Sequence, residues 1–320
     1  MLDVARSLTF AVVGVAAIVW GAESFAENLV RASSRLGVST FALALLLAGA
    51  EPEELATAIA ATLRDAPAIA FGDVVGANVT VCLVALGVGA VVAPLPFGPR
   101  VFRYGLLGLP AGVAAAVFAW DGHIGRVESL VLIALYVLYV AAIWIAERRP
   151  PALGESAEFQ DAAEIRAGSS RRRVGKELVI VLAGLAAMVV GAALLVDGVR
   201  GLVDGEVDQA RISLTVVGFV TGFELVVLAW SAARRGISEA VVAGVVGSYA
   251  YNASMTLGAA ALVEPLRVTD AGLLHVPMVI MVVVLAAVLA LAARRGRLGR
   301  REGVVLLAGY PLFIVVVLLN

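Results

Sequence analysis

Long apolar stretches recur along the whole of this 320-residue chain. Ten can be distinguished, and they cover residues 7–30, 38–63, 68–93, 104–120, 129–146, 178–199, 212–233, 237–263, 271–293 and 303–319. A helix needs about 20 mostly apolar residues to cross the hydrocarbon core of a bilayer, and each stretch is close to that length. With 61% hydrophobic and only 15% charged residues, the chain is not an ordinary soluble globule. The sequence therefore predicts an all-α polytopic membrane protein with ten transmembrane helices.

Basic residues are distributed unequally between the two ends of these predicted helices. The side that holds both termini receives six of the 24 Lys and Arg residues, and the opposite side receives 18. Because cytoplasmic connections carry the excess of basic residues, we expect a multi-pass protein of the cell membrane with both termini outside. The net charge of −1 indicates no nucleic-acid partner, and no obligate protein partner is evident. The expected partners are membrane lipid and inorganic cations.

One long polar segment, rich in Pro, Gly, Ser and charged residues, divides the chain. Such composition is typical of a linker. The sequence thus predicts a first five-helix repeat over residues 1–147, a cytoplasmic linker over 148–176 and a second five-helix repeat over 177–320. The single cysteine, Cys82, excludes an intrachain disulfide and is expected in the core.

Rare residues recur at equal spacings in the two halves. A glycine precedes a glutamate by 33 residues in each half, as Gly21 precedes Glu54 and Gly191 precedes Glu224. Spacings of 11 and 7 residues are also repeated, between Gly76, Gly87 and Pro94 and between Gly247, Gly258 and Pro265. Since each half has an odd number of spans, the second half enters the membrane in the opposite direction. Inverted repeats of this kind are typical of secondary transporters, whose binding site lies near the midplane.

Two glutamates lie near the middle of predicted helices, at matching positions of the repeat. They are Glu54 in the second stretch and Glu224 in the seventh. A charged side chain at the bilayer centre costs on the order of 3 kcal/mol on insertion scales. No Lys or Arg lies at that depth in either stretch, so we expect a bound cation or a proton to offset these charges.

Other oxygen-bearing side chains accompany the two glutamates. Pro52 predicts a kink or break beside Glu54, and Glu51 shares a helical face with Glu54 because the two are three residues apart. Carboxylate, amide and hydroxyl oxygens are the ligands of hard cations such as Ca²⁺. The predicted cation ligands are Glu54, Glu224, Glu51, Thr221, Ser248, Asn252, Asn78 and Asp73. The two histidines, His123 and His275, form no metal-binding or Ser-His pattern, and no catalytic or cofactor-binding residue is predicted.

These residues resemble the sodium/calcium exchanger family of the cation/calcium antiporter superfamily, in a divergent prokaryotic-type form. Each half of that family carries a Gly-Thr-Ser-x-Pro-Glu stretch and, in the next helix, Gly-Asn-x-x-Gly-Ser-Asn-x-x-Asn or Asp. The positions that match are Gly49, Glu54, Gly72, Gly76, Asn78, Glu224, Gly247, Ser248 and Asn252, and Thr221 keeps a hydroxyl at a Ser position. The resemblance implies two inverted five-helix halves, with Ca²⁺ between the two glutamates and Na⁺ at flanking sites, exchanged by alternating access.

Several positions depart from the family pattern. Ala50 and Glu51 stand where Thr and Ser are usual, and Asp73 replaces Asn. Ala77 and Val81 replace neutral ligands of the family, which should weaken at least one sodium site. The sequence predicts a Ca²⁺/Na⁺ antiporter that is not an enzyme and has no cofactor besides its transported ions. The alternatives are antiport of Ca²⁺ against H⁺, antiport of another divalent cation, and a degenerate homologue that does not transport.

Overall fold

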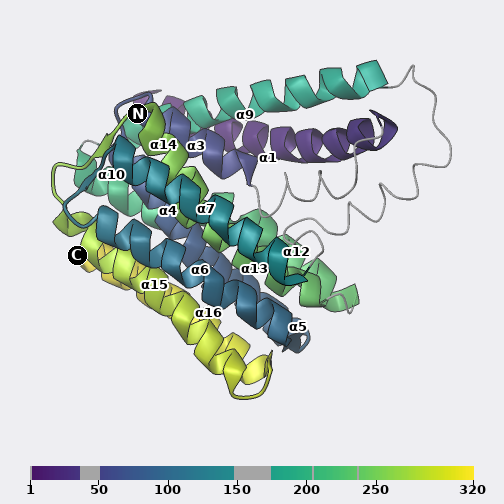
Figure 1. Cartoon of the computed structure of the whole chain (residues 1–320). Coiled ribbons are helices and arrows are strands. Elements are labelled where there is room, and N and C mark those ends of the chain that lie inside the picture. Colours follow the sequence, from purple (N-terminus) through teal and green to yellow (C-terminus); the bar gives the residue numbers. More distant parts are fainter. Residues whose placement is uncertain (1, 37–50, 148–173, 204, 236–237) are drawn as a thin grey trace.

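Helices make up nearly all of the structure, a computed structural model that describes residues 2–36, 51–147, 174–203, 205–235 and 238–320 (Figure 1). Eight of its helical stretches are long and apolar enough to cross a membrane. The predicted stretch 237–263 is also helical over its described part, but it includes several buried polar residues. Of the predicted stretch 38–63, the structure describes only the part from residue 51. Gly49 and Ala50 of the family motif lie outside the described residues. This architecture confirms the all-α polytopic class.

The elements of the first half are α1 (Leu2–Leu36), α3 (Pro52–Thr62), α4 (Pro67–Thr80), the π-helical segment η1 (Val81–Ala85), α5 (Leu86–Val92), strand β1 (Leu95–Pro96), α6 (Pro99–Phe118), strand β2 (His123–Ile124) and α7 (Arg126–Glu147). Those of the second half are α9 (Val174–Leu202), α10 (Glu206–Ile212), η3 (Ser213–Val217), α11 (Gly218–Thr221), α12 (Phe223–Arg235), α13 (Ser238–Ala250), η4 (Tyr251–Thr256), α14 (Leu257–Val263), strand β3 (Leu266–Arg267), α15 (Gly272–Ala293), strand β4 (Arg297–Leu298) and α16 (Arg300–Leu319).

A helix starts just before each of the two repeat-related glutamates. α3 begins at Pro52, directly after Glu51, whose backbone is not helical; proline suits this first position because its missing N–H is not needed there. In the second half α11 ends at Thr221, and α12 begins at Phe223 after the single residue Gly222. Both Glu54 and Glu224 therefore lie in the first turn of a helix, where the helix dipole favours a negative charge.

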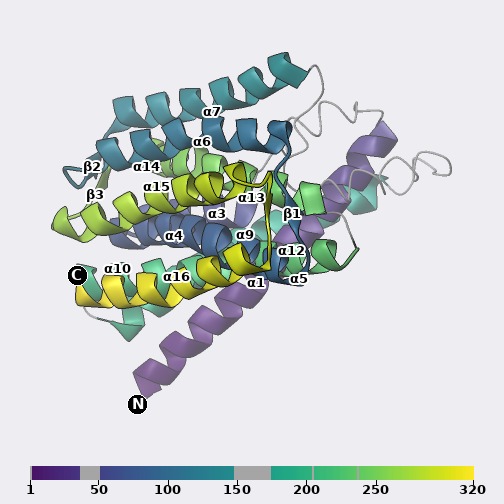
Figure 2. The ribbon, with the colours of Figure 1, turned by 90° about the horizontal axis from the view of Figure 1, so that it is seen from below.

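Two short antiparallel strand pairs reveal the inverted symmetry of the halves. β1 pairs with β4, with Leu95 opposite Leu298. β2 pairs with β3, with Ile124 opposite Leu266. Each pair joins the loop after the third helix of one half to the loop before the last helix of the other. The two pairs lie at opposite ends of the helix bundle (Figure 2), as inverted repeats require.

The first helix of each half packs against its counterpart along a seam of glycines. α1 and α9 run side by side at one edge of the molecule (Figure 1). A Cβ atom added at Gly14 would lie 2.6 Å from the carbonyl oxygen of Gly191, and one added at Gly21 would lie 2.7 Å from that of Gly184. Small residues let backbones of membrane helices approach this closely. The repeat relates Gly14 to Gly184 and Gly21 to Gly191. The contact of Gly14 with Gly191 is therefore equivalent to the contact of Gly21 with Gly184.

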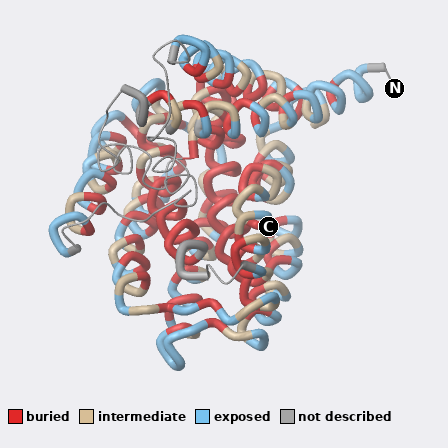
Figure 3. The backbone as a smooth tube through the Cα atoms, turned by 90° about the vertical axis from the view of Figure 1, so that its right-hand side faces the viewer, coloured by how far each residue is buried: buried red, intermediate tan, exposed pale blue. Residues whose placement is uncertain are grey.

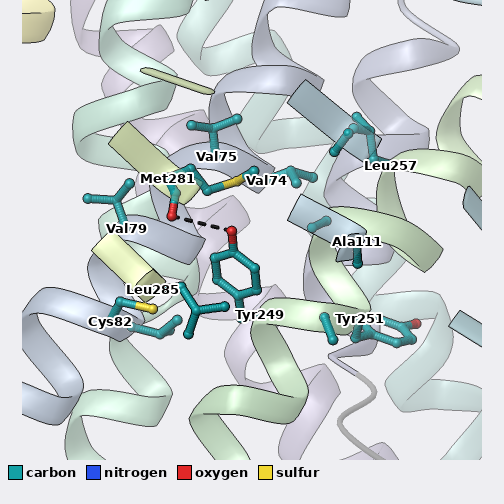
Figure 4. Packing of buried hydrophobic residues seen from close by; sticks show 14 of the residues in the cluster. Val74, Val75, Val79, Cys82, Ala111, Tyr249, Tyr251, Leu257, Met281 and Leu285 are labelled. Atoms are coloured by element: carbon teal, nitrogen blue, oxygen red, sulfur yellow. Dashed lines mark hydrogen bonds between the residues drawn. The ribbon is translucent and has the colours of Figure 1, made fainter. Parts of the chain in front are cut away.

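The helix that begins at Pro67 lies at the centre of the bundle. In the most apolar 18 residues of this helix 83% of the residues are buried, whereas in the corresponding segment of α1 only 22% are buried. Buried residues concentrate in the middle of the molecule (Figure 3). α4 packs there against α15 and η4, and nearby the Tyr249 hydroxyl of α13 donates to the carbonyl of Met281 at 3.3 Å (Figure 4). Cys82 is completely buried beside them with a free thiol, as expected of a core residue.

Candidate cation-binding site

Buried carboxylates surround the start of α3. Glu54 is completely buried, and Glu51 and Glu53 are 9% and 7% exposed. Electrostatic interactions reach Glu54 from Glu51, Asp73 and Glu53. In the part of the chain that the structure describes, no Lys or Arg forms an ion pair with Glu51, Glu54 or Asp73. The carboxylates of Glu51, Glu54 and Asp73 therefore have no side-chain counter-charge among the described residues.

Glu54 is the group that most requires a ligand. No donor group among the described residues bonds to either of its carboxylate oxygens, although both are inaccessible to solvent, and the neighbouring Glu51 carboxyl can bond to it only when one of the two is protonated. Buried polar groups are nearly always hydrogen-bonded, and an uncompensated charge in a low-dielectric interior is strongly unfavourable. A cation or a proton at Glu54 would remove this cost.

Amide and hydroxyl groups of the second half face Glu51. The Asn252 side-chain nitrogen donates to Glu51 Oε2 at 3.0 Å and to Ser248 Oγ at 3.3 Å. The Thr256 hydroxyl in turn donates to Asn252 Oδ1 at 3.1 Å. Ser248, Asn252 and Thr256 follow one another at intervals of four residues on one helical face. The sequence interpretation omitted Thr256, although this spacing would have indicated it.

A second polar contact joins α4 to the end of α11. The Thr221 hydroxyl donates to Asp73 Oδ1 at 2.9 Å, and it also lies 3.1 Å from the carbonyl oxygen of Val217. Asp73 is completely buried, and its other oxygen, Oδ2, has no partner among the described residues. The helices approach closely here, since a Cβ atom added at Gly218 would lie 2.4 Å from the backbone nitrogen of Ala77.

The two polar contacts correspond only in part under the inverted repeat. Glu51 and Thr221 each lie three residues before a repeat-related glutamate, and each bonds to the third helix of the opposite half. In both contacts the carboxylate comes from the first half, as Glu51 or Asp73, while the second half supplies a neutral group. Glu51 and Thr221 are thus equivalent in the repeat, whereas their partners are not, since the spacing of Gly76 and Gly247 relates Asn252 to Val81 and Asp73 to Gly244. The negative charge of both contacts lies in the first half.

Two of the predicted ligands are placed differently. The Asn78 side-chain nitrogen lies 3.4 Å from the Tyr249 carbonyl oxygen and 3.4 Å from Met281 Sδ, so Asn78 contacts α13 and α15. Its Oδ1 has no partner among the described residues. Glu224, the repeat equivalent of Glu54, is only half-buried. The structure thus groups Glu51 with Ser248 and Asn252, beside Glu54, and groups Asp73 with Thr221.

The chemistry of these groups suits a hard cation bound by mixed oxygen ligands. Over the described residues, no three His, Cys, Asp or Glu side chains are close enough together to hold a metal ion by themselves. One or two carboxylates would therefore act with amide, hydroxyl and backbone oxygens, which is the ligand set of Ca²⁺ and related hard ions. The Asn252 amide presents its oxygen instead of its nitrogen after a half-turn about its terminal bond.

Inverted repeats, apolar helices long enough to cross a membrane and buried carboxylates together define a membrane transporter of cations. Comparison with known proteins agrees with this class. The family model described as sodium/calcium exchanger protein matches residues 6–145 and 176–319, so the chain belongs to the sodium/calcium exchanger family.

Relatives match the chain over nearly its full length. The sodium/calcium exchanger MaX1 of Methanosarcina acetivorans is 26% identical over 338 residues, which covers 95% of this chain and 96% of the relative. The inner membrane protein YrbG of Escherichia coli is 23% identical over 310 residues, with 95% and 94% covered. Solved structures of the sodium-calcium exchanger NCX_Mj share the fold, with a TM-score of 0.60 at 22% identity and 98% of both chains covered.

Proposed function

We propose that the chain is a secondary active antiporter that exchanges Ca²⁺ for Na⁺ by alternating access. The observation that carries the proposal is Glu54, completely buried with no donor group among the described residues bonded to either carboxylate oxygen and with Glu51 beside it. Two carboxylates neutralise one divalent ion, which removes most of the cost of holding that ion in a low-dielectric site. Ser248 and Asn252 supply neutral oxygens. Glu224 stays in the proposed ligand set because it is the repeat equivalent of Glu54.

The driving ion can be identified with the protein reconstituted in lipid vesicles. We expect Ca²⁺ uptake when an opposing Na⁺ gradient is imposed and none when only a pH gradient is imposed. Radioactive Ca²⁺ retained in the vesicles is the readout, and protein-free vesicles are the control. Uptake driven by the pH gradient alone would instead establish Ca²⁺/H⁺ antiport. If the vesicles take up no Ca²⁺ under either gradient and Ca²⁺ does not stabilise the protein, the chain is a degenerate homologue that does not transport.

For the counter-ion we propose the contact between Asp73 and Thr221. A single carboxylate balances a monovalent cation, whereas a divalent ion would retain an excess positive charge there. α11 ends at Thr221 and α12 begins at Phe223. Carbonyl groups at the end of a helix can lack an intrahelical partner, although that of Gly218 accepts the Gly222 N–H at 3.2 Å. Carbonyl oxygens at such interrupted helices coordinate Na⁺ in other transporter folds.

Removing the charge of Asp73 tests this assignment. Asp73→Asn keeps an oxygen to accept the bond from Thr221 but no longer balances a cation. We expect the Na⁺ concentration for half-maximal thermal stabilisation to rise about tenfold or more, equivalent to about 1.4 kcal/mol, while stabilisation by Ca²⁺ persists. The matched control is Asp197→Asn, which changes an exposed aspartate bonded to Arg64. An unchanged Na⁺ response in Asp73→Asn would disprove the counter-ion site.

A further inference from the structure

Exposed arginines gather at the end of the molecule that contains β1 and β4. One lies in the second turn of α6, three lie between α15 and α16 or within β4, and two lie in the first turn of α16. They are Arg103, Arg294, Arg295, Arg297, Arg300 and Arg301, and all six are exposed. The pairing of β1 with β4 brings these segments together, although about 200 residues of sequence separate them (Figure 2). We call this group the arginine surface.

The backbone beneath the arginine surface is held firmly. Leu95 and Leu298 are opposite each other in the strand pair and both are completely buried. The Phe97 N–H donates to the Gly296 carbonyl at 2.9 Å and extends the pairing. One acidic residue, Glu302, lies within the surface and contacts Arg295 at 3.4 Å. Positive charge is therefore in large excess on a fixed backbone.

The repeat-related end of the molecule provides an internal comparison. Its strands, β2 and β3, have the same antiparallel pairing, again with buried residues opposite each other. The exposed charged residues around β2 and β3 are Asp121, Arg126, Glu264, Arg267 and Asp270, so acidic groups outnumber basic ones. The strand pair itself therefore does not require arginines. The positive-inside rule accounts for the sign of the charge at one end, but not for its concentration on two joined loops.

We propose that the arginine surface binds the headgroup of an anionic phospholipid in the adjoining leaflet. β1 and β4 each join two helices that are long and apolar enough to cross a membrane, and the ends of such helices are where lipid headgroups would meet them. The planar guanidinium group matches the geometry of a phosphate and can donate two parallel hydrogen bonds to it. Basic clusters beside membrane helices are attracted to anionic headgroups. Two rigidly joined loops can contact one headgroup from two sides.

The proposal can be tested by thermal unfolding of the full-length protein in detergent with added lipid. Phosphatidylglycerol should raise the unfolding temperature, whereas phosphatidylcholine should not. In the triple variant Arg297→Gln, Arg300→Gln and Arg301→Gln, we expect the half-maximal phosphatidylglycerol concentration to rise on the order of a hundredfold. The matched control, Arg126→Gln with Arg267→Gln, removes the two exposed arginines beside β2 and β3 at the opposite end and should respond like the wild type.

Three results would overturn the proposal. They are equal stabilisation by phosphatidylcholine, an equal loss of response in the control variant, and equal stabilisation by water-soluble glycerol phosphate, which would assign the surface to a free phosphate. If the triple variant cannot be purified, the single variant Arg297→Gln and a salt titration of the wild type replace it. The response to phosphatidylglycerol should then weaken as salt screens exposed charges, and a response independent of salt and of Arg297 would contradict lipid binding.

Discussion

Glu54→Gln should abolish Ca²⁺ transport and at the same time make the ion-free protein more stable. Both effects follow from the burial of a carboxylate to which no donor group among the described residues bonds. Losing one partner of a buried charge interaction costs about 3–5 kcal/mol, and 3 kcal/mol corresponds to roughly a hundredfold weaker binding. Without an ion, the neutral amide avoids the penalty of an isolated buried charge.

The two effects are measured separately. Transport is followed as Na⁺-driven Ca²⁺ uptake in vesicles. Stability is followed by thermal unfolding, where Ca²⁺ at one hundred times its Kd should stabilise the wild type by about 2.7 kcal/mol and leave Glu54→Gln unchanged. Glu27→Gln is the control, because Glu27 is an exposed glutamate of α1 that contacts Arg31. Wild-type uptake by Glu54→Gln would refute the assignment of Glu54 as an ion ligand.

Gly218→Ala should destabilise the protein and weaken its response to Na⁺. The added methyl group would lie 2.4 Å from the Ala77 nitrogen and 2.5 Å from the Gly76 carbonyl carbon. Because these are backbone atoms, the methyl can be accommodated only if α11 moves away from α4. Overpacking of this kind typically costs about 1–3 kcal/mol. The same movement would separate Thr221 from Asp73, so the Na⁺ concentration for half-maximal stabilisation should rise.

Gly175→Ala is the matched control for this change. Gly175 also lies in a helix, but a Cβ atom added there meets nothing within 4 Å. Alanine is the better helix former, so we expect an unfolding temperature equal to that of the wild type or slightly higher. If Gly218→Ala behaves in the same way as Gly175→Ala, the close contact between α4 and α11 does not constrain the site.

Much of the fold could be predicted because the determining signals are local. A membrane helix is specified by a run of apolar residues, since hydrocarbon forces the backbone to satisfy its own hydrogen bonds. The start of α3 could be predicted from Pro52 alone. The interruption at Gly222 was not predicted, because a glycine inside an apolar stretch is equally compatible with close packing of continuous helices.

The candidate site could be predicted only in part. Glu51, Ser248 and Asn252 were proposed as ligands from their residue types, and the structure brings them together. The contact between Thr221 and Asp73 spans 148 residues of sequence, and no spacing within either helix indicates it. Which predicted residues bind ions remains a prediction that the experiments above address.

The sequence by itself determined the number of membrane helices, the inverted relation of the two halves and the presence of acidic residues at membrane depth. Apolar length, rare-residue spacing and the cost of a buried charge are properties that can be evaluated without knowing which helices touch. Only the tertiary structure decided that the carboxylates of both cross-repeat contacts come from the first half and that the pairing of β1 with β4 joins the two loops that carry the six arginines. The rotation and tilt of a membrane helix are set by packing against its neighbours, and these determine which side chains meet.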